Sequence, residues 1–247
     1  MIKPIIKSTL ASLGLHVKRA PRVSAGNKYA QSAVLPNATY SPWLDSPDFA
    51  KAYRLISRNT LVDIYRCWEI WHLVEQLKYV DGDFVEVGVW RGGSGCLTAL
   101  RAKALGLNAT IHLCDTFSGV VGTGEHDPDY KGGEHSDTSR DIVIALAKEL
   151  GLDNVAIRTG IFPDETGAEV ADLRFRMCHI DVDVYLSGLN ILEWVWGRLN
   201  VGGIVLFDDY GFSTTAGVTR LVNELGVRDD RLWIHNLNGH AVLVKLR

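Results

Sequence analysis

The sequence lacks the short motifs by which the commonest nucleotide and zinc sites are found. No Gly-Lys-Ser or Gly-Lys-Thr triplet is present, so the chain has no P-loop, and its glycine-rich stretch does not match the Gly-x-Gly-x-x-Gly dinucleotide fingerprint. The four cysteines, at positions 67, 96, 114 and 178, form no Cys-x-x-Cys pair, and no set of His and Cys residues has zinc spacing. These absences exclude three frequent classes of site.

Two further absences bear on location and partners. No run approaches the roughly 18 consecutive apolar residues that span a membrane. The formal net charge is -3 at pH 7, so no excess of basic side chains points to nucleic acid. We expect the unpaired cysteines to be reduced and buried, which is typical of a cytoplasmic protein.

Length and composition indicate one large domain with a small appendage. The 247 residues, 47% hydrophobic and 22% charged, are typical of a soluble globular protein. Residues 1–22 place basic side chains on both sides of a short apolar run, which predicts an amphipathic arm rather than a signal peptide. The following stretch, to about residue 45, is rich in Pro, Ser, Asn and Ala and predicts an irregular linker. We therefore expect an arm and linker over residues 1–45 and one domain over residues 46–247.

The domain begins with helical periodicity and continues with alternating strands and helices. Ser46-Pro47 is typical of a helix start, and apolar residues at three- and four-residue steps predict two helices before residue 80. Asn238-Gly239 predicts a hairpin turn at the C-terminus. The alternation predicts an α/β fold with a mostly parallel sheet. The expected strands are 84–89, 110–114, 155–158, 176–181, 203–207, 232–236 and 241–246, and the expected helices between them are 95–105, 141–150, 186–199 and 215–225.

The first expected strand leads into a glycine-rich turn, Phe-Val-Glu-Val-Gly-Val-Trp-Arg-Gly-Gly-Ser-Gly over residues 84–95. Glycines let a ligand approach the backbone closely, and the following helix N-terminus offers free N–H groups. Glu86, two residues before the first glycine, would repel a pyrophosphate but suits the amino group and hydroxyls of S-adenosylmethionine (SAM). The stretch resembles the first motif of class I SAM-dependent methyltransferases.

The end of the second strand supplies another acid, Asp115. Ligands of open α/β sheets bind at the carboxyl ends of strands, where a carboxylate can accept both hydroxyls of a ribose. The alternative is a turn cap, a frequent role of aspartate. Residues 119–139, which follow, contain five glycines and no apolar periodicity, and we expect them to form a lid over the cofactor.

Four more acids follow two strands that should be neighbours, Asp181 and Asp183 after one and Asp208 and Asp209 after the other. Like charges about 4 Å apart repel by roughly 1 kcal/mol in water and about 4 kcal/mol near a protein surface. A divalent cation relieves that repulsion, and oxygen ligands favour Mg²⁺ or Ca²⁺. Helix caps or ion pairs would explain one such aspartate but not all four.

Four motifs in order narrow the resemblance to one family. Asp-Phe-Val-Glu-Val-Gly-Val-Trp-Arg-Gly-Gly, Cys-Asp-Thr-Phe-Ser-Gly, His-Ile-Asp-Val-Asp-Val-Tyr and Phe-Asp-Asp-Tyr-Gly together resemble the macrocin O-methyltransferases, from about residue 65 to the C-terminus. The resemblance implies a Rossmann-like class I fold with a seven-stranded sheet. It also implies a homo-oligomeric enzyme, dependent on SAM and Mg²⁺, that methylates a sugar hydroxyl of a nucleotide sugar, a natural-product glycoside or a surface glycan.

The resemblance also assigns roles by position. Asp181, Asp208 and Asp209 would hold the metal and Asp183 would be the general base, although spacing leaves Asp181 and Asp183 interchangeable. The SAM site would be lined by Glu86, Gly88, Gly92, Gly93, Ser94, Asp115 and Phe117.

This chemistry suits the residue types. Mg²⁺ bound to two vicinal oxygens lowers the pKa of a sugar hydroxyl, and a nearby carboxylate takes the proton as the methyl group is attacked. A catechol- or phenol-type O-methyltransferase would use a similar metal site. The third reading is a non-catalytic SAM-binding protein, which has no need of four clustered acids.

Overall fold

The computed structural model describes Leu10, Ser12 and residues 39–247. The chain divides into two compact units, residues 1–40 and residues 41–247, and the fold described below is that of the second. Most of the expected arm and linker lies outside the described residues, so the boundary at residue 45 stays a prediction. No helix in the described residues is long and apolar enough to cross a membrane.

Short helices precede the sheet, as predicted. A 3-10 turn, η1 (Pro42–Asp45), leads into α2 (Pro47–Ile56), which has its proline in the first turn. Helix α3 (Ile64–Gln76) starts at Asp63, whose carboxylate accepts hydrogen bonds from the backbone N–H groups of Tyr65 and Arg66. A second 3-10 turn, η2 (Leu77–Tyr79), ends this part of the chain. The two predicted helices are therefore confirmed.

The sheet has seven strands in the order β3-β2-β1-β4-β5-β7-β6. The first five strands are parallel, while β7 runs antiparallel to β5 and β6 antiparallel to β7. This confirms the mostly parallel sheet and the C-terminal hairpin. The strands are β1 (Asp83–Val87), β2 (Ile111–Asp115), β3 (Val155–Thr159), β4 (Phe175–Ile180), β5 (Leu199–Tyr210), β6 (Arg231–His235) and β7 (Gly239–Lys245).

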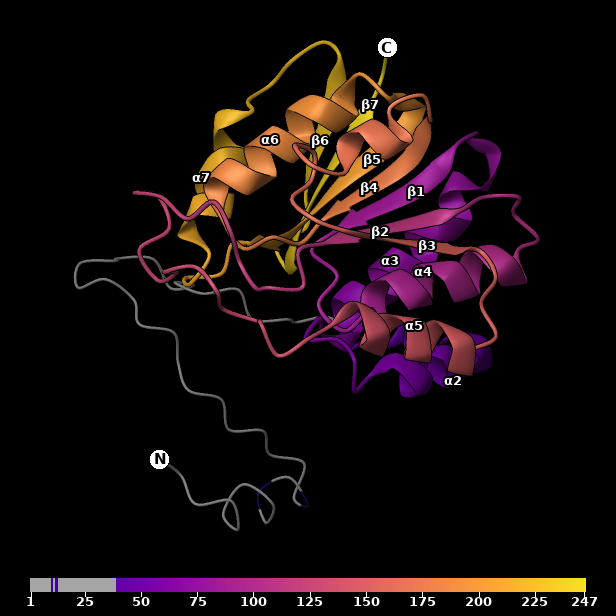
Figure 1. Ribbon diagram of the computed structural model, residues 1–247. Helices are drawn as coiled ribbons and strands as arrows, with labels where there is room; N and C mark the ends of the chain where they lie inside the picture. The colour runs from indigo at the N-terminus through magenta and orange to yellow at the C-terminus, as the bar shows by residue number, and fades with distance from the viewer. Residues whose placement is uncertain (1–9, 11, 13–38) are drawn as a thin grey trace. The chain divides into compact units, whose positions relative to one another are not determined.

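Helices cover both faces of the sheet (Figure 1). Alternate residues of the strands supply the two cores: Val85 and Val87 pack toward α6 and α7, whereas Phe84 packs toward α3, α4 and α5. Helix α2 packs outside α3 and α4 around Phe49 and Ile56. The helices between and after the strands are α4 (Gly93–Ala104), α5 (Arg140–Glu149), η3 (Gly167–Val170), α6 (Tyr185–Trp196) and α7 (Ala216–Glu224).

Strand β5 is longer than the predicted 203–207. It begins at Leu199, which pairs with Phe175 of β4 before a shift in register, and it continues to Tyr210, which pairs with Gly239 of β7. The shift lets Asn200 to Gly203 bulge without leaving the strand. Because β1 lies between β2 and β4, the direction of strand order reverses at β1, and open α/β sheets bind ligands at the carboxyl ends beside such a reversal.

Candidate active site

A cavity of about 300 Å³ opens at the carboxyl ends of the parallel strands. Its walls come from the turns after β1, β2, β3 and β4, from the end of β5, from residues 59–62 ahead of α3, and from residues 119–135. The volume lies at the lower end of the range for small-molecule sites. The cavity therefore brings together every strand end that the sequence marked as functional.

The turn after β1 approaches the end of β4 so closely that only glycine fits at its first position. Gly88 has φ 87°, and a Cβ added there would lie 1.7 Å from the carbonyl oxygen of Asp181. Four residues on, Gly92 has φ 85° and is the N-cap of α4, whose early residue Ser94 lines the cavity. The turn thus fixes the start of α4 against the ends of β1 and β4.

All four acids that follow β4 and β5 line this cavity. Burial, followed by the charges of Asp208 and Asp209, raises the pKa of Asp181 well above its ordinary value. Burial and the charge of Asp208 do the same to the pKa of Asp209. Within the described part of the chain, Oδ2 of Asp208 and Oδ2 of Asp209 are buried without a hydrogen-bond partner. Repulsion and unpartnered oxygens are what a cation would relieve.

Two of these acids have a strained backbone. Asp183 has φ 64° and Asp209 has φ 66°, in the left-handed region that favours glycine. Non-glycine residues in this region cost about 1–3 kcal/mol and cluster at functional sites. Both residues line the cavity, so the strained positions coincide with the cluster of acids.

Comparison with known proteins places the chain in a family. Residues 25–238 match the family described as Macrocin-O-methyltransferase (TylF). The chain belongs to this family. The predicted enzyme class, a SAM-dependent O-methyltransferase, is thereby confirmed.

Two curated relatives and one solved structure illustrate the similarity. The chain is 33% identical over 165 residues to the 8-demethyl-8-(2,3-dimethoxy-alpha-L-rhamnosyl)-tetracenomycin-C 4'-O-methyltransferase of Streptomyces olivaceus, and the match covers 62% of each chain. It is 28% identical over 222 residues to the demethyldecarbamoylnovobiocin O-methyltransferase of Streptomyces niveus, over 83% of each. The structure of the O-methyltransferase NovP matches with a TM-score of 0.65 and 24% identity, covering 76% of this chain and 83% of that one, which confirms the fold.

In this O-methyltransferase, Asp115 has a more constrained setting than the sequence suggested. Its Oδ2 accepts hydrogen bonds from the backbone N–H groups of Val89 (2.6 Å) and Trp90 (2.8 Å), and its Oδ1 accepts one from Phe117 (2.6 Å). A carboxylate has about four acceptor positions, so about one remains. Asp115 lines the cavity and also caps the β1–α4 turn, the alternative considered above, and its expected contact with the ribose of SAM stays a prediction.

Glu86 lies behind the cavity rather than in its wall, which differs from the expected contact with SAM. Its side chain is 3% exposed, with Oε1 accepting from the Ser94 hydroxyl (3.0 Å) and Oε2 3.0 Å from Nδ1 of His179. Of the seven residues expected at the SAM site, Gly88, Ser94 and Asp115 line the cavity, while Glu86, Gly92, Gly93 and Phe117 do not.

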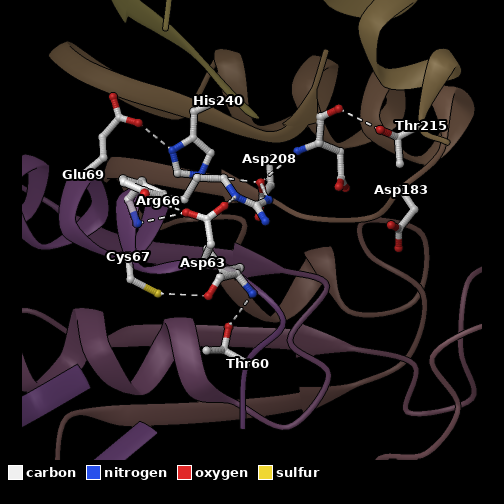
Figure 2. Close-up of polar contacts among 12 residues, drawn as sticks. Thr60, Asp63, Arg66, Cys67, Glu69, Asp183, Asp208, Thr215 and His240 are labelled. Carbon is white, nitrogen blue, oxygen red and sulfur yellow. Dashed lines mark hydrogen bonds and ion pairs between the residues drawn. The ribbon is translucent and has the colours of Figure 1, made fainter. Parts of the chain in front are cut away.

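A buried polar network next to the acids was missed by the sequence reasoning. Arg66 of α3 forms an ion pair with Asp208, and His240 of β7 lies between Asp208 and Glu69 of α3 (Figure 2). Burial alone would raise the pKa of Asp208, but the charges of His240, Arg66 and His179 lower it below its ordinary value. The nearby positive charges therefore outweigh burial at Asp208, whereas at Asp209 the charge of Arg66 does not, and the pKa values of Asp181 and Asp209 stay raised.

Residues 119–139 are irregular and close one side of the cavity. The Tyr130 hydroxyl donates a 2.6 Å hydrogen bond to Oδ1 of Asp183, and Nε2 of His135 lies 4.0 Å from Oδ2 of the same carboxylate. Asp127 anchors the segment by accepting from the N–H of Tyr185, at the start of α6, at 2.9 Å. The segment therefore brings its own polar side chains onto the acid expected to act as base, an arrangement that sequence spacing gave no means of finding.

Proposed function

We propose that the chain transfers the methyl group of SAM to a sugar hydroxyl in a Mg²⁺-dependent reaction. The observation that carries the proposal is the placing of four acids around one cavity, directly beside the glycine turn after β1. The name of one relative, an O-methyltransferase acting on a rhamnosyl tetracenomycin, supports a glycosylated acceptor. Homo-oligomeric assembly and a cytoplasmic location stay predictions.

The residues fit a hard divalent cation. Asp181, Asp208 and Asp209 would hold it, because two of their oxygens are buried without a described partner and two of the three acids have raised pKa values. Among the described residues these three do not form a set whose ligand atoms all lie within 4.8 Å of one another, so binding would draw them together. When bound, Mg²⁺ supplies a positive charge that lowers the pKa of a coordinated hydroxyl.

Asp183 would accept the proton of the acceptor hydroxyl. It lines the cavity, and Tyr130 holds its Oδ1, so the proton would be taken by a carboxylate whose orientation is already fixed. Burial raises the pKa of Asp183, and it outweighs the hydrogen bond from Tyr130 and the charge of His135, both of which lower that pKa. A raised pKa brings a carboxylate closer to the working pH of a general base.

The other half of the cavity would hold SAM. The turn after β1, kept in place by Asp115, presents the N-terminal end of α4 to the ligand. Residues 119–139 would exclude water from the reacting atoms, since the sulfonium methyl group reacts by direct displacement. The acceptor would enter on the side of Asp183 and Tyr130, so that its hydroxyl lies between the base and the methyl group.

The first test is calorimetric. We expect SAM to bind to the purified protein, NAD not to bind, and Mg²⁺ to give a separate binding event that Asp209→Asn abolishes. Failure to bind SAM would overturn the proposal. Asp153→Asn, which changes an exposed acid paired with Lys103, serves as the matched control and should leave both events unchanged.

The second test concerns the acceptor and the base. Methyl transfer from labelled SAM would be measured on rhamnosylated and other deoxysugar glycosides, nucleotide sugars and catechols. Transfer to catechols alone would contradict the sugar acceptor. Asp183→Asn should keep the fold and SAM affinity but lower turnover by about 10²- to 10⁴-fold. Unchanged turnover would exclude Asp183 as the base, and full activity after EDTA treatment would exclude the metal.

A further inference from the structure

Three buried polar atoms behind the cavity point toward one another and have no hydrogen-bond partner in the described residues. They are Nε2 of His179, Nε2 of His240 and Oδ2 of Asp208. Ligand atoms of these three residues all lie within 4.8 Å of one another, and the residues are at most 2% exposed. Leaving a buried polar atom without a partner is costly in free energy, so three such atoms close together favour an occupant.

The strand alternation explains why these side chains meet. On β1, β4, β5 and β7 the residues adjacent to Glu86, His179, Asp208 and His240 belong to the core under α6 and α7, among them Val87, Ile180, Phe207 and Ala241. The four polar residues therefore point to the opposite face, toward α3. Glu86 and His179 are also register partners in neighbouring strands.

Each histidine is oriented by a carboxylate on its other ring nitrogen. Nδ1 of His179 is 3.0 Å from Glu86, and Nδ1 of His240 is 2.6 Å from Glu69 (Figure 2). A carboxylate at one imidazole nitrogen fixes the ring and leaves the other nitrogen free as a ligand, which is the usual second shell of a metal-bound histidine. Both Nε2 atoms are thereby directed at Asp208.

The separations between the histidine nitrogens and Asp208 can be compared with those expected around a metal ion and around a water molecule. Nε2 of His240 is 3.5 Å from Oδ1 of Asp208, and Nε2 of His179 is 4.0 Å from Oδ2. Tetrahedral ligands at roughly 2.1 Å from a metal lie about 3.4 Å apart. Two partners of one tetrahedral water at roughly 2.8 Å lie about 4.6 Å apart. The His240 separation, which is measured to Oδ1, is closer to the metal value, and the His179 separation lies midway between the two values.

We propose that His179, His240 and Asp208 form a buried site for a borderline divalent transition ion such as Zn²⁺. Two imidazoles and one carboxylate suit this class of ion, whereas a set of carboxylates alone suits Mg²⁺. The ion would enter from the cavity, because Asp208 forms part of its wall while the histidines lie behind it. It would tie β4, β5 and β7 together beneath the acids.

The local charge allows a cation at this point. Glu86, Glu69 and Asp208 are acidic, and Arg66 is the basic side chain that the structure pairs with Asp208. Arg66 contacts Oδ1 of Asp208, while the unpartnered oxygen is Oδ2, so an ion bound through Oδ2 would not displace Arg66. The site shares Asp208, including its unpartnered Oδ2, with the Mg²⁺ site proposed above, while the two histidines belong to this site alone.

The site is tested with the metal alone. Full-length protein would be dialysed with Zn²⁺ in excess Mg²⁺, freed of unbound ions and analysed for zinc. We expect about one Zn²⁺ per chain in the wild type, and its loss in His179→Gln and in His240→Gln. His112→Gln is the matched control, since that buried imidazole already pairs through both ring nitrogens with Asp83 and Arg158. It should keep its zinc.

Two further measurements cover the case in which a ligand variant does not fold. Glu69→Gln leaves all three ligands in place and should weaken Zn²⁺ binding by about 10- to 100-fold. X-ray absorption at the zinc edge of the wild type should show scattering from two imidazoles. A zinc shell without imidazole, no retained zinc, or unchanged binding in both histidine variants would overturn the site and leave a water-filled polar cluster.

The two metal proposals fail separately. Asp209→Asn should abolish the Mg²⁺ event and keep zinc, because Asp209 is not part of the histidine site. Loss of zinc in this variant would show that the zinc occupies the carboxylates, and it would overturn the further site while leaving the carboxylate metal site standing.

Discussion

Asp115 and Asp209 occupy equivalent places at the ends of parallel strands, yet their surroundings are opposite. Asp115 accepts three backbone hydrogen bonds at 2.6 to 2.8 Å. Oδ2 of Asp209 is buried without a described partner, and the charge of Asp208 adds to burial in raising its pKa. Position at a strand end is therefore not enough to assign a role to an acid. The number of backbone N–H groups that donate to its carboxylate is more informative, because a carboxylate with few donors keeps oxygens free to bind a ligand.

The two halves of the cavity differ in the same way. The half beside β1 and β2 is built from backbone geometry, and the hydrogen bonds of Asp115 hold its turn in place. The half beside β4 and β5 is built from like charges, and Asp181 and Asp209 repel one another until a cation or a proton intervenes. Four changes test this difference between the two halves.

The largest effect is expected from Gly88→Ala, because Gly88 lies where the two halves of the cavity meet. The added Cβ would lie 1.7 Å from the carbonyl oxygen of Asp181, at φ 87°. Relieving this clash would require β1 to move away from β4, so we expect the unfolding free energy to fall by more than about 4 kcal/mol. Chemical denaturation measures it. Gly106→Ala, at φ 65° with no described atom within 4 Å, is the control and should cost only about 1 kcal/mol.

Asp115→Asn should have the next largest effect. The amide NH₂ would replace one oxygen and face backbone N–H donors, either those of Val89 and Trp90 or that of Phe117. We expect a loss of about 1–3 kcal/mol in stability and weaker SAM binding, measured by denaturation and calorimetry. Unchanged stability would show that the three hydrogen bonds do not hold the turn.

Removal of metal should expose the repulsion in the other half as a pH effect. A carboxyl whose pKa is raised on folding stabilises the protein fully below its unfolded pKa, near 3.8 for Asp181 and Asp209, and this contribution is lost as pH rises through the folded value. We expect the EDTA-treated protein to lose stability as pH rises from near 3.8 toward neutral pH, by about 1.4 kcal/mol for each unit by which a pKa is raised. Mg²⁺ should flatten this slope. The lowered pKa of Asp208 acts in the opposite sense, below this window.

The smallest effect on stability is expected from Tyr130→Phe, which removes one hydrogen bond worth about 1 kcal/mol. Since that bond lowers the pKa of Asp183, its loss should raise the pKa further and move the acidic limb of the pH–rate profile to higher pH. Tyr185→Phe, which breaks a 2.7 Å bond to Glu224, is the matched control and should leave the profile in place. If the acidic limb of the Tyr130→Phe profile does not move, Tyr130 does not affect the pKa of the base.

Part of the site was predictable because strand ends in a parallel sheet meet at one edge. Asp181, Asp183, Asp208 and Asp209 were placed together on that ground, and the structure brings all four to one cavity. The alternation of side chains along the strands would also have allowed one further prediction. Glu86 and His179 fall on the polar-bearing face of neighbouring strands, and their pairing could have been inferred from that pattern.

Other residues could not have been found this way. Arg66 and Glu69 lie on a helix that precedes the sheet, more than 100 residues before Asp208, and nothing in their spacing indicates which strand they pack on. Tyr130 lies in a segment without periodicity, so its contact with Asp183 depends on how residues 119–139 are anchored.

The alternation of strands and helices could be predicted from the sequence alone, because it follows from local hydrophobic periodicity. The same holds for the glycine turn after β1 and for the acids at the strand ends, because their positions follow from the order of residues along the chain. The tertiary structure decided what each acid does. The partners of Asp115, Glu86 and Asp208 come from loops, strands and helices distant in the chain. Only packing sets the distances over which burial and charge act on a carboxylate.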